Sequence, residues 1–276
     1  MRSALAPRRR LLVVAVALLV VALAATVALR ACAARPAARE GFPDQSRPGP
    51  VLLIPGYGGG QAALSVLAQR IRATGRAATI VALPGDGTGD LNAQAATLDG
   101  AVTRALRDGA PSVDLVGYSA GGVVALLWLA RHDGVHTARR IVTLGAPLHG
   151  TRLAATGAAV VPDACPTACQ QLAPGSALLA ELDRLTVPAR LPWLSVWTDD
   201  DQTVVPPDSA RLPGAVNVPV QTVCPDAHLA HGDLPADPLV GDLVLGALGT
   251  APLTAPDASD CARSRTSRLS SSRPGS

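Results

Sequence analysis

The sequence predicts an α/β fold in which a sheet of about six mostly parallel strands carries helices on both faces. Three observations predict it. Short aliphatic runs alternate with longer stretches of helical periodicity, the pattern of a parallel sheet covered by helices. A G-x-S-x-G motif joins one of these runs to a long apolar helical stretch. With 276 residues and few aromatic side chains, the chain can form one domain whose core is built from Leu, Val, Ile and Ala.

The strands and helices are expected in the order in which these runs alternate. Asp90 and Ser176 are predicted N-caps of the second and fourth helices, because short polar side chains accept hydrogen bonds from first-turn amides. The expected strands are 51–55, 78–83, 113–117, 140–145, 193–198 and 216–221, and the expected helices are 61–73, 91–107, 120–132, 176–185 and 237–248.

Residues 1–33 are predicted to be a signal peptide or an N-terminal membrane anchor. An arginine-rich start precedes residues 11–29, which carry no charge and are apolar apart from one threonine. Such a pattern is typical of export segments, and this run is also long enough to span a bilayer. Residues 31–33, A-C-A, resemble a cleavage site, and residues 29–32 have the outline of a lipoprotein box. Each outcome places the rest of the chain outside the cytoplasm, secreted or anchored in a bacterial cell membrane and facing outward.

Composition divides the remaining chain into three parts. Residues 34–49, rich in Ala, Arg and Pro, are predicted to be a linker, and residues 50–248 the globular domain. Residues 249–276, rich in Ser, Arg, Pro and Thr, are predicted to be a disordered tail. The net charge is +3 and the 24 basic residues, all arginine, are scattered, so no nucleic-acid partner is predicted. The chain is expected to be a monomer that needs no cofactor and no metal.

The G-x-S-x-G motif makes Ser119 a candidate nucleophile. In residues 113–122, VDLVGYSAGG, a strand meets a helix at the serine, which is the context of a nucleophile elbow. Gly117 and Gly121 flank a sharp turn where larger side chains would clash. Ala120 opens the helix, so its amide is free to face a developing oxyanion. The alternative interpretation is an ordinary glycine-rich turn between a strand and a helix.

Other reactive residues follow other predicted strands, as expected when a site lies at the carboxyl ends of a parallel sheet. The loop 55–60, PGYGGG, brings the Tyr57 amide forward as a second oxyanion donor. Residues 199–201 are three aspartates, of which only one is expected to turn inward because packed carboxylates repel one another. His228 and His231 follow the last strand and are the candidates for a catalytic base.

Chain order favours these two histidines over the others. In the elbow-containing hydrolases the nucleophile is followed by the acid and then by the histidine. His149 follows the fourth predicted strand and therefore comes too early. The alternative for either His228 or His231 alone is a solvated loop position, but the order argues against both being idle.

Six motifs of this chain, taken in order, resemble the small bacterial α/β-hydrolase lipases and esterases of the lipase class 2 group. The likeness runs from about Val51 to Gly246, and it implies a compact α/β-hydrolase fold. The motifs are VLLIPGYGGG, LPGDGTGDL, VDLVGYSAGGVVALLW, IVTLGAPLHGT, LSVWTDDDQTVVP and HGDLPADPLV.

The resemblance implies a catalytic triad of Ser119, Asp201 and His231, with the Tyr57 and Ala120 amides as the oxyanion hole. Where many relatives have His-Gly in the oxyanion loop, this chain has Pro-Gly at 55–56, a change that leaves the backbone donor in place. The acid and the base are assigned by the family's downstream spacing, with Val204 and Pro206 after the acid and Leu234 and Val240 after the base.

The activity that the resemblance implies is hydrolysis of carboxylic esters, of lipids or of small molecules, through an acyl-enzyme. Leu148, Val160 and Val161 are expected to form a wall for the acyl chain. Two alternatives use the same features. The triad would serve equally for acyl transfer to a cell-envelope acceptor. A non-catalytic surface binding module is the other alternative, although such a module would be expected to lack a triad member and here all three are present.

Four of the five cysteines are expected to form two disulfides, as is common in exported domains. Cys32 belongs to the N-terminal segment. The other four allow three pairings. A bridge from the loop of Cys165 and Cys169 to Cys224 is preferred, because it would brace the loop of the candidate histidines. Metal binding by Cys165 and Cys169 is a minor alternative, because a second close pair is missing.

Overall fold

The computed structural model describes residues 16–22 and 41–271, and the chain divides into two units, residues 1–40 and 41–276. In the first unit, residues 16–22 are helical. The rest of the predicted signal or anchor, including Cys32, lies outside the described residues. No helix in the described part of the chain is both long enough and apolar enough to cross a membrane.

Six strands form one fully parallel sheet in the order β2-β1-β3-β4-β5-β6, which confirms the predicted fold class. Each strand coincides with a predicted one, apart from differences at the ends. The bounds are β1 Val51–Ile54, β2 Ala78–Ile80, β3 Val113–Tyr118, β4 Ala138–Leu144, β5 Trp193–Trp197 and β6 Val216–Pro219.

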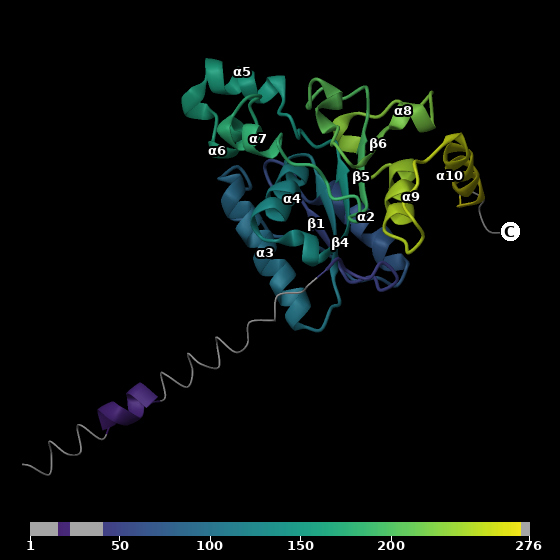
Figure 1. Ribbon diagram of the computed structural model, residues 1–276. Coiled ribbons are helices and arrows are strands. Elements are labelled where there is room, and N and C mark those ends of the chain that lie inside the picture. The colour runs from purple at the N-terminus through teal and green to yellow at the C-terminus, as the bar shows by residue number, and fades with distance from the viewer. Residues whose placement is uncertain (1–15, 23–40, 272–276) are drawn as a thin grey trace, which may run out of the picture. The chain divides into compact units, whose positions relative to one another are not determined.

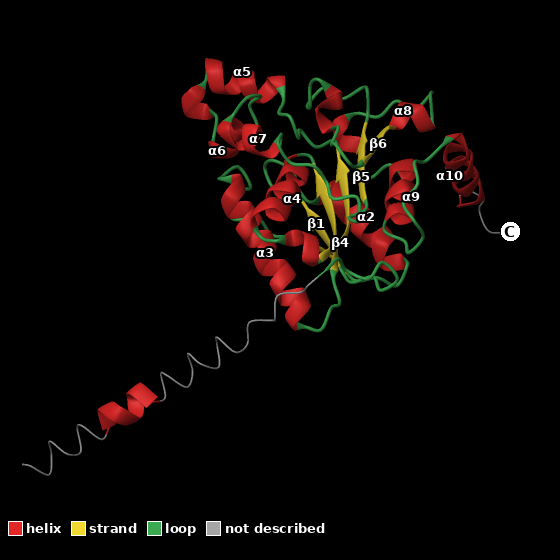
Figure 2. Ribbon diagram, in the orientation of Figure 1, coloured by secondary structure: helices red, strands yellow, loops and turns green. Residues whose placement is uncertain are grey.

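Helices cover both faces of the sheet, with α3 and α4 on one side and α2 and α9 on the other (Figures 1 and 2). Alternate strand residues point to opposite faces. Leu52 and Leu115 therefore belong to the core under α3 and α4, whereas Leu53 and Val116 belong to the core under α2 and α9. Both cores are mainly aliphatic, as the scarcity of aromatic residues predicts, and the core under α3 and α4 also contains the buried Trp128 and Trp193.

All five predicted helices are present, and the side chains of Asp90 and Ser176 cap α3 and α7 by accepting from the amides of Asn92 and Leu179. Four further helices, α5, α6, α8 and α10, were not predicted. The helices are α2 Ala62–Ala73, α3 Leu91–Arg107, α4 Ala120–Arg131, α5 Arg152–Val160, α6 Thr167–Gln171, α7 Ala177–Leu182, α8 Val220–Val223, α9 Pro238–Ala247 and α10 Ala258–Ser271.

A buried charge cluster lies at the amino ends of β3 and β4. The Asp114 carboxylate, 0% exposed, accepts from Nη2 of Arg76 at 2.6 Å and from Nη2 of Arg139 at 2.5 Å. Arg139 also donates to the carbonyls of Leu248 and Gly249. Arg140 donates to further carbonyls of the segment that ends α9. The cluster thus joins the start of two central strands to the end of the last sheet-covering helix.

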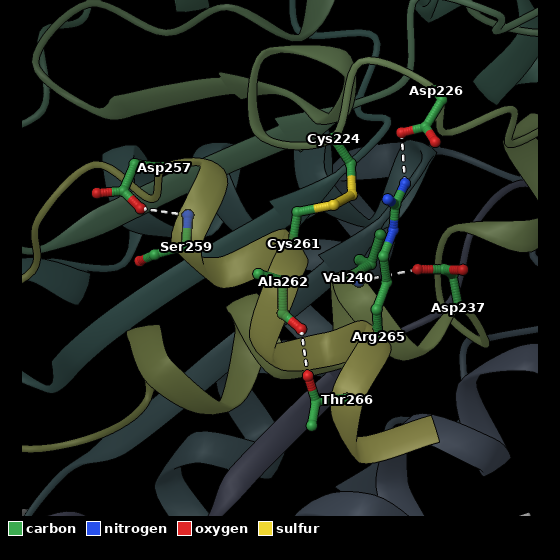
Figure 3. Close-up of a disulfide and its surroundings, with 10 residues drawn as sticks. All are labelled: Cys224, Asp226, Asp237, Val240, Asp257, Ser259, Cys261, Ala262, Arg265 and Thr266. Carbon is green, nitrogen blue, oxygen red and sulfur yellow. Dashed lines mark hydrogen bonds and ion pairs between the residues drawn. A yellow bond between two sulfur atoms is a disulfide. The ribbon is translucent and has the colours of Figure 1, made fainter. Parts of the chain in front are cut away.

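The prediction of a disordered tail at 249–276 is wrong for its described part, which contains helix α10. This helix is too polar to be recognised from an apolar face, and a disulfide between Cys224 and Cys261 holds it to the domain (Figure 3). An ion pair between Arg265 and Asp226 joins the same two segments. The other disulfide joins Cys165 to Cys169, so the preferred bridge from that pair to Cys224 is also wrong. The loop of the candidate histidines is braced from α10 instead.

Removing the Cys224–Cys261 disulfide should lower the free energy of unfolding by about 4 kcal/mol, because its cysteines are 37 residues apart and the bridge restricts a long loop of the unfolded chain. The Cys224→Ser/Cys261→Ser variant and the wild type would be compared by urea denaturation. The Cys165→Ser/Cys169→Ser variant is the matched control. Its separation of 4 residues predicts a loss of only about 2 kcal/mol. Equal losses for the two pairs would contradict this account.

Candidate active site

Ser119 lies at the junction of β3 and α4 in a backbone conformation that non-glycine residues rarely adopt, with φ 52° and ψ −128°. Its amide donates to the carbonyl of Leu144 at 2.8 Å. The flanking glycines are sterically required. A Cβ on Gly117 would lie 2.6 Å from the carbonyl oxygen of Gly121, and one on Gly121 would lie 2.3 Å from the carbonyl oxygen of Ile54. This turn therefore has the geometry predicted for the elbow.

The loop after β1 approaches Ser119 from the neighbouring strand. A Cβ on Gly56 would lie 2.8 Å from Cβ and 3.4 Å from Oγ of Ser119, so only glycine allows the two backbones to come this close. Tyr57 follows directly and is 44% exposed. Because the connections from β1 and β3 lead to opposite sides of the sheet, these loops separate at a topological switch point, where α/β folds place their sites.

Asp201 and His231 form a buried pair. Nδ1 of His231 lies 2.6 Å from Oδ2 of Asp201, and the two residues are 8% and 3% exposed. The other carboxylate oxygen accepts from the amides of Thr203 and Val204, each at 2.8 Å. A carboxylate accepts from the N–H at Nδ1, so in the neutral imidazole the lone pair is on Nε2. Asp199 and Asp200 are exposed, so one of the three aspartates turns inward, as predicted.

The other candidate histidine lies in a different environment. The side chain of His228 is 85% exposed, and its Nδ1 lies 3.1 Å from Oδ2 of Asp200. His149 has neighbours at both ring nitrogens, with Oδ1 of Asp183 at 2.5 Å from Nδ1 and the carbonyl of Arg211 at 2.9 Å from Nε2. Neither ring is paired with the inward-facing aspartate.

Tyr118 supports the His231 loop and was not singled out from the sequence. Its hydroxyl donates to the carbonyl of His231 at 3.2 Å, and the two rings lie 5.2 Å apart. Burial, followed by the carboxylates of Asp201 and Asp233, raises the pKa of Tyr118 to about 12, so the hydroxyl keeps its proton and remains a donor. Its position beside the serine in G-Y-S was the only available signal.

An apolar cavity of about 170 Å³ opens beside Ser119. The wall predicted from Leu148, Val160 and Val161 is not the wall observed. Leu148 is buried away from this cavity, and the two valines are exposed at the end of α5 and just beyond it. The expectation failed because α5 and α6 were not predicted. The lining residues are Tyr57, Ser119, Pro147, Thr151, Leu153, Ala154, Cys169, Leu172, Thr203 and Val204.

The described residues include one group with the spacing of a metal site, formed by Cys224, Asp226 and Cys261. Its two sulfur atoms are joined in a disulfide, and thiolates rather than disulfides are the sulfur ligands of metals. This group therefore does not fit a metal ion.

Comparison with solved structures identifies proteins of similar fold. No protein-family model and no curated protein matches the chain. Among solved structures it is similar to Aspergillus fumigatus lipase B, with 17% identity, a TM-score of 0.60, and coverage of 77% of this chain and 54% of that one. The mature Bacillus licheniformis lipase BlEst2 has 19% identity and a TM-score of 0.58, with 76% and 96% covered.

A structure of the metagenome-derived lipolytic enzymes LipS and LipT has 18% identity and a TM-score of 0.56, with 76% of this chain and 99% of that one covered. The chain thus spans about half the length of the Aspergillus lipase and almost the full length of the other two. The sheet order, the turn at Ser119 and these likenesses agree, and the chain has the α/β-hydrolase fold.

Proposed function

We propose that the protein is a serine hydrolase of carboxylic esters, of the lipase or esterase type. The observation that carries the proposal is the buried Asp201–His231 pair at the carboxyl ends of the strands, on the side where Ser119 sits in its strained turn. Tyr118, next to Ser119 in the chain, contacts the ring of His231 and so links the turn to the pair. The apolar cavity beside Ser119 suits an acyl chain.

In this mechanism Nε2 of His231 takes the proton from Oγ of Ser119 as that oxygen attacks the ester carbonyl carbon. Asp201 holds the imidazole tautomer and stabilises the imidazolium. The tetrahedral oxyanion binds to the amides of Tyr57 and Ala120. His231 then gives the proton to the departing alkoxide, which leaves an acyl-enzyme. Water, activated by the same imidazole, attacks this intermediate and releases the acid.

The protein is proposed to act outside the cytoplasm as a monomer. Its two disulfides are consistent with an oxidising compartment. The basic and apolar composition of residues 1–33 supports export, either as a cleaved signal or as a retained anchor.

A fluorophosphonate probe tests the proposed nucleophile, because it labels only serines that a neighbouring base activates. Incubation of the folded protein should give one adduct, located on Ser119 by mass spectrometry. Ser119→Ala should abolish both labelling and ester hydrolysis. Ser65→Ala, which changes a partly exposed serine on α2, should leave both unchanged. An unlabelled Ser119 in folded wild-type protein would refute the hydrolase proposal.

The cavity predicts a preference for short acyl chains. An apolar cavity of about 150 Å³ holds a molecule with about six carbon atoms, and this one measures about 170 Å³. Across a p-nitrophenyl ester series, kcat/KM should be highest at about four to six acyl carbons and fall about tenfold or more at twelve. Leu172→Ala should move the maximum to longer chains, whereas Val66→Ala on α2 should not. A profile that rises steadily to twelve carbons would show that the acyl chain binds elsewhere.

A further inference from the structure

The loop between β4 and α5 contains the sequence PLHGT, which lines part of the cavity beside Ser119 but has no part in the catalytic steps described above. It ends at Thr151, the N-cap of α5, whose side chain is almost fully buried between this loop and the loop that follows β5. We propose that Thr151 is a positioning residue that fixes the orientation of the Asp201 carboxylate toward His231. This inference rests on the proposed hydrolase function and adds a member to its machinery.

The hydroxyl of Thr151 joins the two loops. It donates to the carbonyl of Thr203 at 2.7 Å and accepts from the amide of Val205 at 3.1 Å. The amide of Leu153 lies at 3.4 Å from the same oxygen, as expected for an N-cap. The amide of Arg152 donates to the carbonyl of Val205 at 2.9 Å, so the contact is continued by the backbone.

One peptide group transmits this contact to the acid. The carbonyl of Thr203 and the amide of Val204 belong to the same planar unit. The carbonyl accepts from Thr151, while the amide donates to Oδ1 of Asp201 at 2.8 Å. Fixing one end of a planar group fixes the direction of the other. With Oδ1 held in this way, Oδ2 is directed to Nδ1 of His231 at 2.6 Å.

Thr151 is itself held on a rigid base. Gly150 has φ +87°, and a Cβ there would lie 2.7 Å from the Pro174 nitrogen, so the turn packs closely on residue 174 and requires glycine. The carbonyl of Gly150 accepts from the hydroxyl of Ser209 at 2.5 Å. His149 lies between Asp183 and the Arg211 carbonyl, which ties the turn to α7 and to the segment after the acid loop. The PLHGT turn is thus a fixed point against which the acid loop is positioned.

Thr151→Val keeps the shape of the side chain and removes the hydroxyl. The Thr203 carbonyl and the Val205 amide then lose this partner, and the peptide that orients Asp201 is less restrained. Small misplacements of catalytic groups cost up to about a hundredfold in rate. With a butanoate ester we therefore expect kcat to fall about tenfold to a hundredfold and the rate of fluorophosphonate labelling to fall in parallel. KM should change less than about threefold. Thr151→Ser keeps the hydroxyl and should restore both rates.

A double-mutant cycle with Asp201→Asn separates positioning from a merely structural role. If Thr151 acts through Asp201, then Thr151→Val should lower kcat by less than about twofold in the Asp201→Asn background. Thr143→Val is the matched control, because it removes a buried hydroxyl that bonds to Ser195 and Trp193 and does not contact the acid loop. It should lower stability and leave the kcat of folded protein unchanged.

Equal fractional losses from Thr151→Val in the wild-type and Asp201→Asn backgrounds would overturn the proposal, as would a wild-type kcat for folded Thr151→Val. Thr151→Cys, which replaces the hydroxyl by a weak S–H donor, gives the same comparison if Thr151→Val does not fold. Failure of the hydrolase function is recognised separately, since wild-type Ser119 would then remain unlabelled, and the inference would fall with it.

Discussion

His231→Ala should lower kcat for a short-chain ester by about 10⁴- to 10⁶-fold, the range found when the histidine of a serine triad is removed. Without the imidazole, nothing takes the proton from Ser119 as it attacks. The large effect is expected because His231 is buried against Asp201, a residue that is itself fixed by two amides. Steady-state kinetics on purified variants, corrected for the folded fraction, would measure it.

His228→Ala is the matched control for this experiment. His228 is three residues earlier in the same loop, but its side chain is 85% exposed and faces the exposed carboxylate of Asp200. Removing it should change kcat less than about twofold. A large loss from His228→Ala together with near-normal activity of His231→Ala would reverse the assignment. Comparable losses from both would mean that the loop, rather than one ring, is the sensitive element.

The sheet could be predicted because each strand is recognisable from its own short stretch of sequence. Each strand is an aliphatic run followed by a turn, and the Ser119 turn has a motif that steric requirements impose on it. Helices α5 and α6 were missed because they are short and small-residue rich, and their stability comes from packing on each other with the Cys165–Cys169 disulfide. Helix α10 was missed because its sequence is polar and does not predict packing against the domain. It is held there by a disulfide to Cys224, which lies 37 residues before Cys261 in the chain.

The candidate catalytic residues could be predicted from the sequence, but the residues that hold them in position could not. Ser119, Asp201 and His231 follow strands in a known order, which sequence alone reveals. The residues that orient them act through hydrogen bonds between distant segments. Thr151 contacts residues 203–205, and Tyr118 contacts the His231 carbonyl. No spacing in the sequence encodes these pairs, because they depend on which carboxyl ends become neighbours in the sheet.

The contacts of Asp114 could not be predicted from the sequence either, because in the sequence it is an ordinary residue of a predicted strand. In the folded protein it is the only carboxylate in contact with the described arginines of the cluster, Arg76 and Arg139. Arg140 lies beside them, and its pKa is lowered by burial and then by the charge of Arg139, with Asp114 opposing the shift. Positive charge is thus in excess, and the carbonyls that end α9 and Asp114 together compensate it.

Asp114→Asn should therefore lower the free energy of unfolding by about 3–5 kcal/mol, the cost of leaving a buried charge without its partner. Two guanidinium groups would lose their shared counter-charge in a site from which water is largely excluded. Urea denaturation of wild type and variant would measure the loss. Asp242→Asn is the control, because it removes an ion pair with Arg70 whose side chains are 29% and 41% exposed, and such pairs contribute less than about 1 kcal/mol.

Because the Asp114 cluster lies away from Ser119, Asp114→Asn is expected to affect stability and not catalysis. Asp114 is the second residue of β3 and Ser119 directly follows the strand, so residues 115–118 of β3 separate the two. Asp114→Asn should consequently destabilise the protein while the folded fraction keeps its kcat. Arg139→Met, combined with Asp114→Asn, should cost less than the sum of the two single losses, because the first change already breaks the pair. Strictly additive losses, or a folded Asp114→Asn variant with impaired kcat, would show that the carboxylate has a role other than compensating these arginines.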